Sequence, residues 1–114
     1  RSLLAQGVCL ARAGKLDEAE RKLSRAYELD PTSPTTALNL SEVLYRRSEY
    51  ERARFYIRRV NQRDDLSNAQ SLWLALRMER RLGNKAAESN HAAQLRSRYP
   101  TSPEYQSFLK GEFE

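Results

Sequence analysis

Few residues of this chain have side chains that could carry out nucleophilic, acid–base or metal chemistry. Cys9 and His91 are the only cysteine and the only histidine among the 114 residues. A metal site built from thiolate and imidazole ligands needs several such groups, and the sequence does not supply them. It also has no Gly-rich phosphate loop and no nucleophile-plus-base pattern. We therefore expect no enzymatic activity, no bound metal and no cofactor.

The residues that could have done chemistry are better interpreted as structural. Cys9 lies between two aliphatic residues, and we interpret it as a small core residue. His91 falls on a predicted helix of polar and small residues, where a solvated position is expected. The acidic pairs Asp17–Glu18 and Asp64–Asp65 fall at helix starts or in loops, where carboxylates cap a helix or complement its dipole.

The charge of the chain raises the question of an anionic partner. The net charge is +5 at pH 7, and sixteen arginines stand beside four lysines. An excess of this kind can indicate nucleic-acid binding. The arginines are interleaved with glutamates, however, as in RRSEYERARFYIRR, which is the pattern of solvated helices with i,i+4 ion pairs. Nucleic-acid binding is therefore the least favoured function, and we expect no nucleic-acid partner.

The composition favours an all-helical protein. Hydrophobic residues make up 39% and charged residues 31%, with only four glycines and four prolines. This is rich in helix formers and poor in the turn residues that a β-sandwich needs. No apolar run approaches the roughly 18 residues that a membrane-spanning helix requires, so we expect no direct membrane insertion by this segment.

The tetrapeptide PTSP occurs twice, at 31–34 and at 100–103, with its copies 69 residues apart. Its first proline disfavours helix at the preceding residue. Its serine can then cap a new helix, with the second proline at the first helical position. Each copy therefore predicts a joint between two helices. The separation is close to two units of about 34 residues, a period that is typical of helical repeats.

The stretch GKLDEAERKLSRAYELDP, residues 14–31, resembles the second half of a tetratricopeptide repeat. Gly14 ends the first helix, Ala19 and Ala26 are the small residues, Leu23 is the large core residue and Pro31 closes the motif. The resemblance implies an all-α superhelix, an α-α solenoid, of about three helix pairs plus a C-terminal capping helix. We expect seven helices and no strands in one domain over residues 1–114. The expected repeats span about 1–33, 34–67 and 68–102, and the end helix spans 103–110.

The later repeats depart from the motif in defined places. Ser48 stands where repeat two should have its glycine, and Glu88 stands where repeat three should have its key alanine. Ala19 and Ala53 occupy matching places in repeats one and two, so we expect close helix crossings at both.

The end helix should act as a cap for the last repeat, because a terminal repeat must cover its apolar edge. We expect its apolar residues to cover the edge left by three residues of repeat three. The covering residues are Tyr105, Phe108 and Leu109, and the covered residues are Ala86, Ala93 and Leu95.

The last third of the chain carries a more specific resemblance. The segments SLWLALR, AAQLRSRYP and SPEYQSF, within residues 68–109, are similar to the C-terminal end of the type IV pilus biogenesis/stability protein family, the PilF/PilW pilotin lipoproteins. Members of that family have about six repeats after a lipidated cysteine. The resemblance implies that this chain is the C-terminal half of such a protein. The lipid anchor is then expected in the part before this segment, and Cys9 is not the lipidation site.

The same resemblance implies a function and a location. The chain would be a non-catalytic scaffold that assists secretin assembly or localisation and pilus stability, at the periplasmic face of the outer membrane. Its partner would be a protein or peptide, either the secretin or another pilus-assembly component. The alternative is a generic peptide-docking repeat adaptor of another assembly.

In stacked helix pairs the first helices line a concave groove, which gives candidate binding residues. Most of them are arginines and aromatic residues, the side chains that anchor protein interfaces, with aliphatic residues at one end. The alternative for Tyr45 and Trp73 is that they pack between repeats. The candidate residues are Leu4, Val8, Arg12, Asn39, Glu42, Tyr45, Arg46, Trp73, Arg77 and Arg81.

Overall fold

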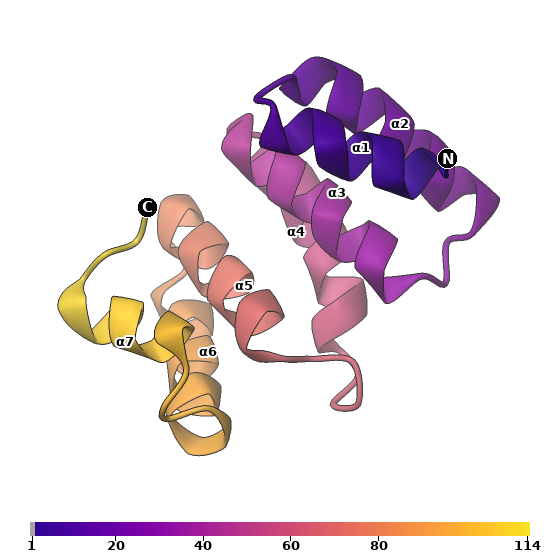
Figure 1. Ribbon diagram of the computed structural model, residues 1–114. Helices are drawn as coiled ribbons and strands as arrows, with labels where there is room; N and C mark the ends of the chain where they lie inside the picture. The colour runs from indigo at the N-terminus through magenta and orange to yellow at the C-terminus, as the bar shows by residue number, and fades with distance from the viewer. Residues whose placement is uncertain (1) are drawn as a thin grey trace. The chain divides into compact units, whose positions relative to one another are not determined.

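The computed structural model describes residues 2–114, and within them it contains seven α-helices and no strand (Figure 1). This confirms the all-helical prediction; Arg1, included in the first predicted repeat, lies outside the described residues. The helices are α1 (Leu3–Arg12), α2 (Leu16–Leu29), α3 (Pro34–Arg46), α4 (Tyr50–Asn61), α5 (Ala69–Leu82), α6 (Lys85–Arg98) and α7 (Pro103–Lys110). The end helix has the predicted bounds.

The chain divides into two compact units, Arg1–Val60 and Asn61–Glu114. The first contains α1, α2, α3 and nearly all of α4, and the second contains α5, α6 and α7. Each unit is described by itself below. The prediction of one domain over residues 1–114 stays a prediction.

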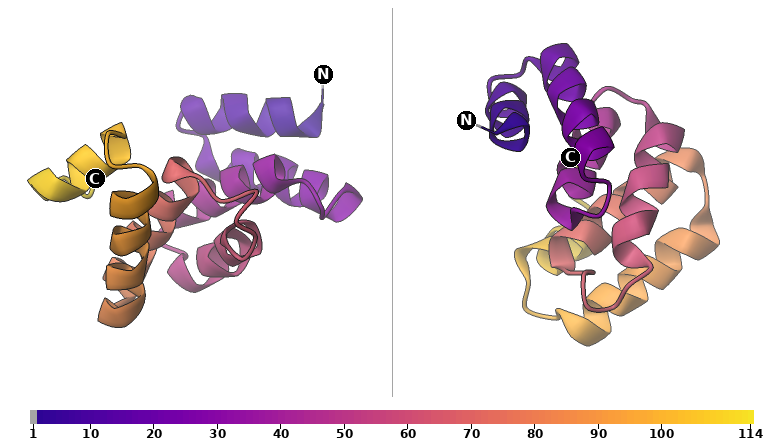
Figure 2. Two further views of the ribbon diagram at one scale, coloured as in Figure 1. Left: turned by 90° about the horizontal axis from the view of Figure 1, so that it is seen from below. Right: turned by 90° about the vertical axis from the view of Figure 1, so that its right-hand side faces the viewer.

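In the first unit, neighbouring helices pack in antiparallel pairs. Helix α1 contacts α2, and α2 contacts α3 (Figures 1 and 2). The helices α1 and α2 approach closely at Gly7, where an added Cβ atom would lie 2.6 Å from Cγ of Leu23. Ala19 and Ala53, which were predicted at close crossings, are both fully buried. Small residues at these places let the backbones come together.

Polar contacts tie the helices of the first unit to one another. The Ser41 hydroxyl donates a 2.8 Å hydrogen bond to the Ala53 carbonyl, joining α3 to α4. Glu20 on α2 forms ion pairs with Arg47, at 2.7 Å, and with Arg52, at 2.9 Å. The hydrogen bond to Glu20 raises the pKa of Arg52 above its already high ordinary value. One carboxylate therefore connects α2 with the end of α3 and with α4.

Both copies of PTSP form the predicted joints. Ser33 Oγ accepts a 3.2 Å hydrogen bond from the Thr36 N–H, and Ser102 Oγ accepts a 3.1 Å hydrogen bond from the Tyr105 N–H. The second proline of each copy is the first residue of the following helix. The repeated tetrapeptide therefore marks two equivalent N-caps, as its residues indicated.

The turns inside the three helix pairs share one backbone conformation. Gly14 has φ 79° and Gly83 has φ 78°, in the left-handed region that glycine adopts without a steric penalty. Ser48 takes the same place in the α3–α4 turn with φ 63°. Repeat two therefore keeps the turn although it lacks the glycine.

The second unit has its own core around α5. Its cluster contains Leu72, Trp73, Leu76 and Leu95, and several half-buried hydrophobic residues pack against it. Those residues are Ala69, Ala92, Tyr99, Tyr105, Phe108 and Phe113. Helix α7 contacts both α5 and α6, so it covers this core as expected.

The capping prediction was wrong in some of its residues. Tyr105 and Phe108 pack on the core, and so does Leu95. Leu109 is 59% exposed, however, and Ala86 and Ala93 are exposed as well. The eight residues of α7 present only one face to the core, and Leu109 lies off that face next to Phe108.

Candidate protein-binding surface

The first unit carries seven of the ten predicted groove residues, on α1 and α3. Leu4, Val8 and Arg12 follow one another at four-residue spacing, so they lie on one face of α1. Leu4 and Val8 are half-buried, whereas Arg12 is exposed. The face therefore changes from aliphatic to basic toward the C-terminal end of the helix.

Helix α3 places its basic end beside the basic end of α1. Arg46 donates a 3.0 Å hydrogen bond from its guanidinium to the Ala11 carbonyl, one residue before Arg12. That carbonyl lies in the last turn of α1, where a cation satisfies an end carbonyl and complements the helix dipole. Arg12 and Arg46, which are distant in sequence, are thereby brought to the same end of the first unit.

Two of the other predicted residues of α3, Asn39 and Tyr45, are held by neighbouring residues. Asn39 donates a 2.9 Å hydrogen bond to the Thr35 carbonyl, within the same helix. Glu42 is half-buried. Tyr45 is only 6% exposed, and its ring lies 5.5 Å from the ring of Tyr50, measured between centroids. This burial argues against a ligand-facing position for Tyr45, although Tyr50 belongs to the same repeat and packing between repeats stays a prediction.

In the second unit the predicted residues form a stripe along α5. Trp73, Arg77 and Arg81 recur at four-residue spacing, so one face presents the indole and both guanidinium groups. The Arg77 guanidinium carbon lies 5.3 Å from the centre of the Trp73 ring, a cation–π distance. Trp73 is 9% exposed and belongs to the core cluster. Its burial follows the packing alternative, while the groove as a whole stays a prediction.

The sequence reasoning assigned no role to residues 111–114, yet this segment contacts the α5 stripe. Phe113 stacks on Trp73 with 5.8 Å between ring centroids, and Glu114 forms an ion pair with Arg81. The signal that could have drawn attention to it is an aromatic residue between two glutamates, directly after a helix-ending glycine.

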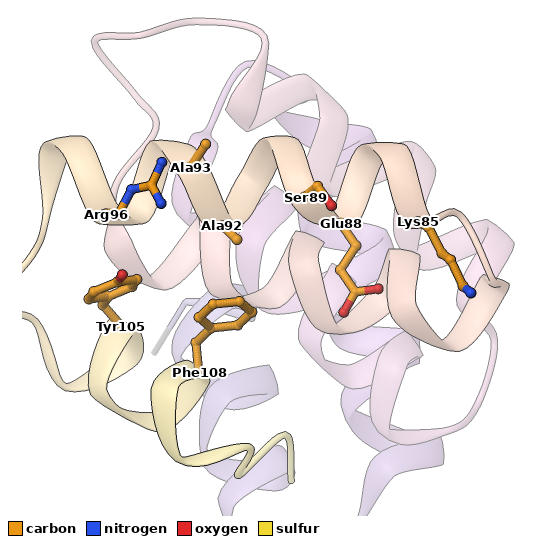
Figure 3. A pocket seen from close by; sticks show the side chains of 8 residues that line it. All are labelled: Lys85, Glu88, Ser89, Ala92, Ala93, Arg96, Tyr105 and Phe108. Carbon is orange, nitrogen blue, oxygen red and sulfur yellow. The ribbon is translucent and has the colours of Figure 1, made fainter.

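The structure also contains a cavity between α6 and α7 that the sequence reasoning missed. It has a volume of about 410 Å³. Figure 3 shows Tyr105 and Phe108 pointing from α7 toward small side chains of α6, with charged side chains along α6. The sequence feature that could have indicated this cavity is the run of small residues on α6. In the structure these residues lie opposite the two aromatic rings. The lining residues are Lys85, Glu88, Ser89, Ala92, Ala93, Arg96, Tyr105 and Phe108.

The residues considered for chemistry at the outset lie apart from these surfaces. Cys9 is half-buried on α1 rather than in the core, and His91 is half-buried on α6 rather than solvated, so both expectations were wrong in degree. Asp17 and Glu18 lie in the first turn of α2, as predicted. Residues 2–114 contain no group of three His, Cys, Asp or Glu residues that could hold a metal ion.

Among the described helices, none has the length and apolar character needed to cross a membrane.

With paired helices, left-handed turns and small residues at the crossings, the fold is that of a helical-repeat protein. A tetratricopeptide repeat family model matches residues 10–76, more than half of the chain, and the chain belongs to this family. Among curated proteins, it is 29% identical over 102 residues to the type IV pilus assembly protein PilF of Pseudomonas aeruginosa. That match covers 90% of this chain and 40% of the relative.

Two solved structures are similar over nearly the whole chain. One is the crystal structure of PilW, described as a widely conserved type IV pilus biogenesis factor, with a TM-score of 0.83 and 28% identity. The match covers 94% of this chain and 49% of that one. The other comes from the functional characterization of Pseudomonas aeruginosa pilF, with a TM-score of 0.79 and 28% identity, covering 92% and 47%. The chain therefore spans about half of these relatives or less.

Proposed function

We propose that this chain is a non-catalytic protein-interaction module of type IV pilus biogenesis. The observation that carries the proposal is the likeness to PilF and PilW, which extends over 90% of the chain in sequence and 94% in structure. More specifically, we propose that the module assists secretin assembly or localisation at the periplasmic face of the outer membrane and contributes to pilus stability.

The side chains on the candidate surface support a binding role. On α1 and α3, the half-buried aliphatic residues Leu4 and Val8 lead to the basic end formed by Arg12 and Arg46. Protein interfaces contain both apolar side chains and arginine. Arginine is enriched in them, whereas the other charged residues are depleted from their centres. An extended or helical segment of a partner protein is the ligand class that such a repeat surface accommodates.

The test is a titration of the folded chain against the periplasmic domains of the cognate secretin. The test variant is Arg12→Glu. We leave Arg46 unchanged because it bonds to the Ala11 carbonyl, and reversing it would disturb α1 itself. For an acidic partner surface, we expect roughly tenfold weaker binding, mainly through slower association with a flatter salt dependence.

The control variant is Arg58→Glu, which makes the same charge change on the second helix of a pair. Arg58 is exposed, and it lies in the last turn of α4 as Arg12 does in α1. Thermal melts monitored by circular dichroism should be recorded first, to check that both variants fold. Equal binding by the two variants would place the interface elsewhere, and absence of binding by the unmodified chain would contradict the secretin as its partner.

A further inference from the structure

The four residues after α7 fold back along α5. Gly111 ends α7 in the left-handed conformation, with φ 71°, and the Glu112 N–H donates a 2.9 Å hydrogen bond to the Ser107 carbonyl. This reversal directs the chain toward the C-terminal end of α5 (Figure 1). The segment Gly111–Glu114, with the sequence GEFE, is called the return segment below.

Phe113 is the anchor of the return segment. Its ring stacks on Trp73 at 25° between ring planes and meets Phe108 edge-on, with centroids 6.3 Å apart. The Arg80 guanidinium carbon lies 3.9 Å from the centre of the Phe113 ring, within cation–π range. One phenyl ring is therefore held between an indole, a second phenyl ring and a guanidinium group.

Charge complementarity accompanies this aromatic contact. Glu114 forms an ion pair with Arg81, at the end of the stripe that begins with Trp73. Arg77 lies between them on the same face, over the Trp73 ring. The α5 face formed by Trp73, Arg77, Arg80 and Arg81 thus combines an aromatic platform with three guanidinium groups, of which that of Arg80 also pairs with Glu88 at 3.1 Å. It holds a segment that carries a ring and carboxylates.

We propose that this α5 face recognises a partner segment in which an aromatic residue is followed by a carboxylate, and that the return segment competes for the same place. The inference rests on the proposed binding function and narrows it to a chemical class of ligand. The ion pair of the return segment is solvent-exposed, so this pair adds little to its retention. A partner with the same chemistry and a longer contact can displace it.

Trp73 gives a direct readout because it is the only tryptophan of the chain. The probe is the synthetic peptide acetyl-GEFE-amide, titrated into the full chain and into its Phe113→Ala variant while Trp73 emission is followed. In the variant, we expect the emission maximum to shift to longer wavelength, because the indole loses its stacked ring. Added peptide should reverse that shift as it fills the vacated place.

The variant should bind the peptide roughly tenfold or more tightly than the unmodified chain. A segment tethered in the same chain competes at an effective concentration that can reach the millimolar range, and the substitution removes that competitor. The control protein is Phe55→Ala, which truncates a phenylalanine on α4 that is 56% exposed. It should leave Trp73 emission and peptide affinity as they are in the unmodified chain. The control peptide, acetyl-GEAE-amide, should bind neither form.

A second variant, Glu114→Lys, keeps the phenyl ring and reverses the charge that meets Arg81. It should bind the peptide a few times more tightly than the unmodified chain, so it tests the competition even if Phe113→Ala lowers stability. Unchanged Trp73 emission in Phe113→Ala, or the same peptide affinity in all three proteins, would overturn the inference.

The peptide and the secretin domains separate this inference from the proposed function. Peptide binding without binding of the secretin domains would support the recognition site and contradict the proposed partner. Binding of the secretin domains with no competition from the peptide would support the proposed partner and contradict the recognition site.

Discussion

The hydroxyl of Ser41 and the carbonyl of Ala53 are joined by a 2.8 Å hydrogen bond at a place where both residues are fully buried. The bond crosses from α3 to α4, so it fixes the two helices of repeat two at one distance. A buried hydroxyl needs such a partner, because burying it without one costs free energy. The small volume of both residues permits the close contact.

Replacing Ser41 with alanine should lower the free energy of unfolding by about 1 kcal/mol, the typical net value of one hydrogen bond. The measurement is denaturant unfolding followed by far-ultraviolet circular dichroism. Ser89→Ala is the matched control, since Ser89 is an exposed residue of α6 and the substitution makes the same change in helix propensity without losing a buried bond. Equal unfolding midpoints for both variants would show that the Ser41 bond contributes nothing.

Replacing Ser48 with glycine should stabilise the chain by up to about 1 kcal/mol. Ser48 has φ 63°, where a Cβ atom is strained, and the strain relieved exceeds the added entropy of glycine in the unfolded chain. The reverse change, Gly83→Ala, places a Cβ atom at φ 78° and should destabilise by about 1 kcal/mol or more. Thermal melts of both variants decide the matter, and a lower melting temperature for Ser48→Gly would contradict the assignment of strain.

Replacing Gly7 with alanine should lower the free energy of unfolding by roughly 1 kcal/mol. At a solvent-exposed position inside a helix, the same change would raise it by a similar amount, because alanine favours the helix more than glycine does. The new Cβ atom would lie 2.6 Å from Cγ of the fully buried Leu23, so the Leu23 side chain or one of the two helices must shift. A double-mutant cycle with Leu23→Ala provides the check. In that background the Gly7 substitution should become stabilising, and additive effects would show that no collision occurs.

Replacing Phe108 with alanine should cost about 2 kcal/mol, less than the 3–5 kcal/mol of a fully buried phenylalanine because Phe108 is half-buried. Leu109→Ala should stay within about 0.5 kcal/mol, because its side chain is 59% exposed. Urea unfolding of the two variants tests which residue of α7 caps the core. A larger loss for Leu109→Ala would reverse the assignment.

The sequence predicted the joints and turns of the fold well because each depends on local chemistry. A serine before a proline is enough to begin α3 and α7, and Gly83 is enough to end α5. Helical spacing predicted the stripe of Trp73, Arg77 and Arg81 in the same way. It did not predict how much of each side chain is buried, because that depends on residues that are distant in sequence.

Phe113 shows why the remainder of the site was missed. Periodicity identifies residues within a helix, whereas Phe113 lies after the end of α7 and has no pattern of its own. Its contact with Trp73 closes a loop of forty residues, and only the path of the chain through α6 and α7 brings the two rings together. Trp73 was predicted either to line a groove or to pack between repeats, and its ring in fact stacks on Phe113 of its own unit. The cavity between α6 and α7 was missed for the same reason.

The division of the chain after Val60 has a consequence for how it loses its structure. Each unit buries its own set of side chains, Leu23 and Leu40 in the first and Leu72 and Leu95 in the second. Repeat proteins of this kind open in parts, with stabilities set by each part and its neighbour. In hydrogen-exchange measurements, the slowest-exchanging amides should therefore fall into two groups with different protection factors, one on each side of residue 60. A protease would then cut the less protected half first and leave the other half folded.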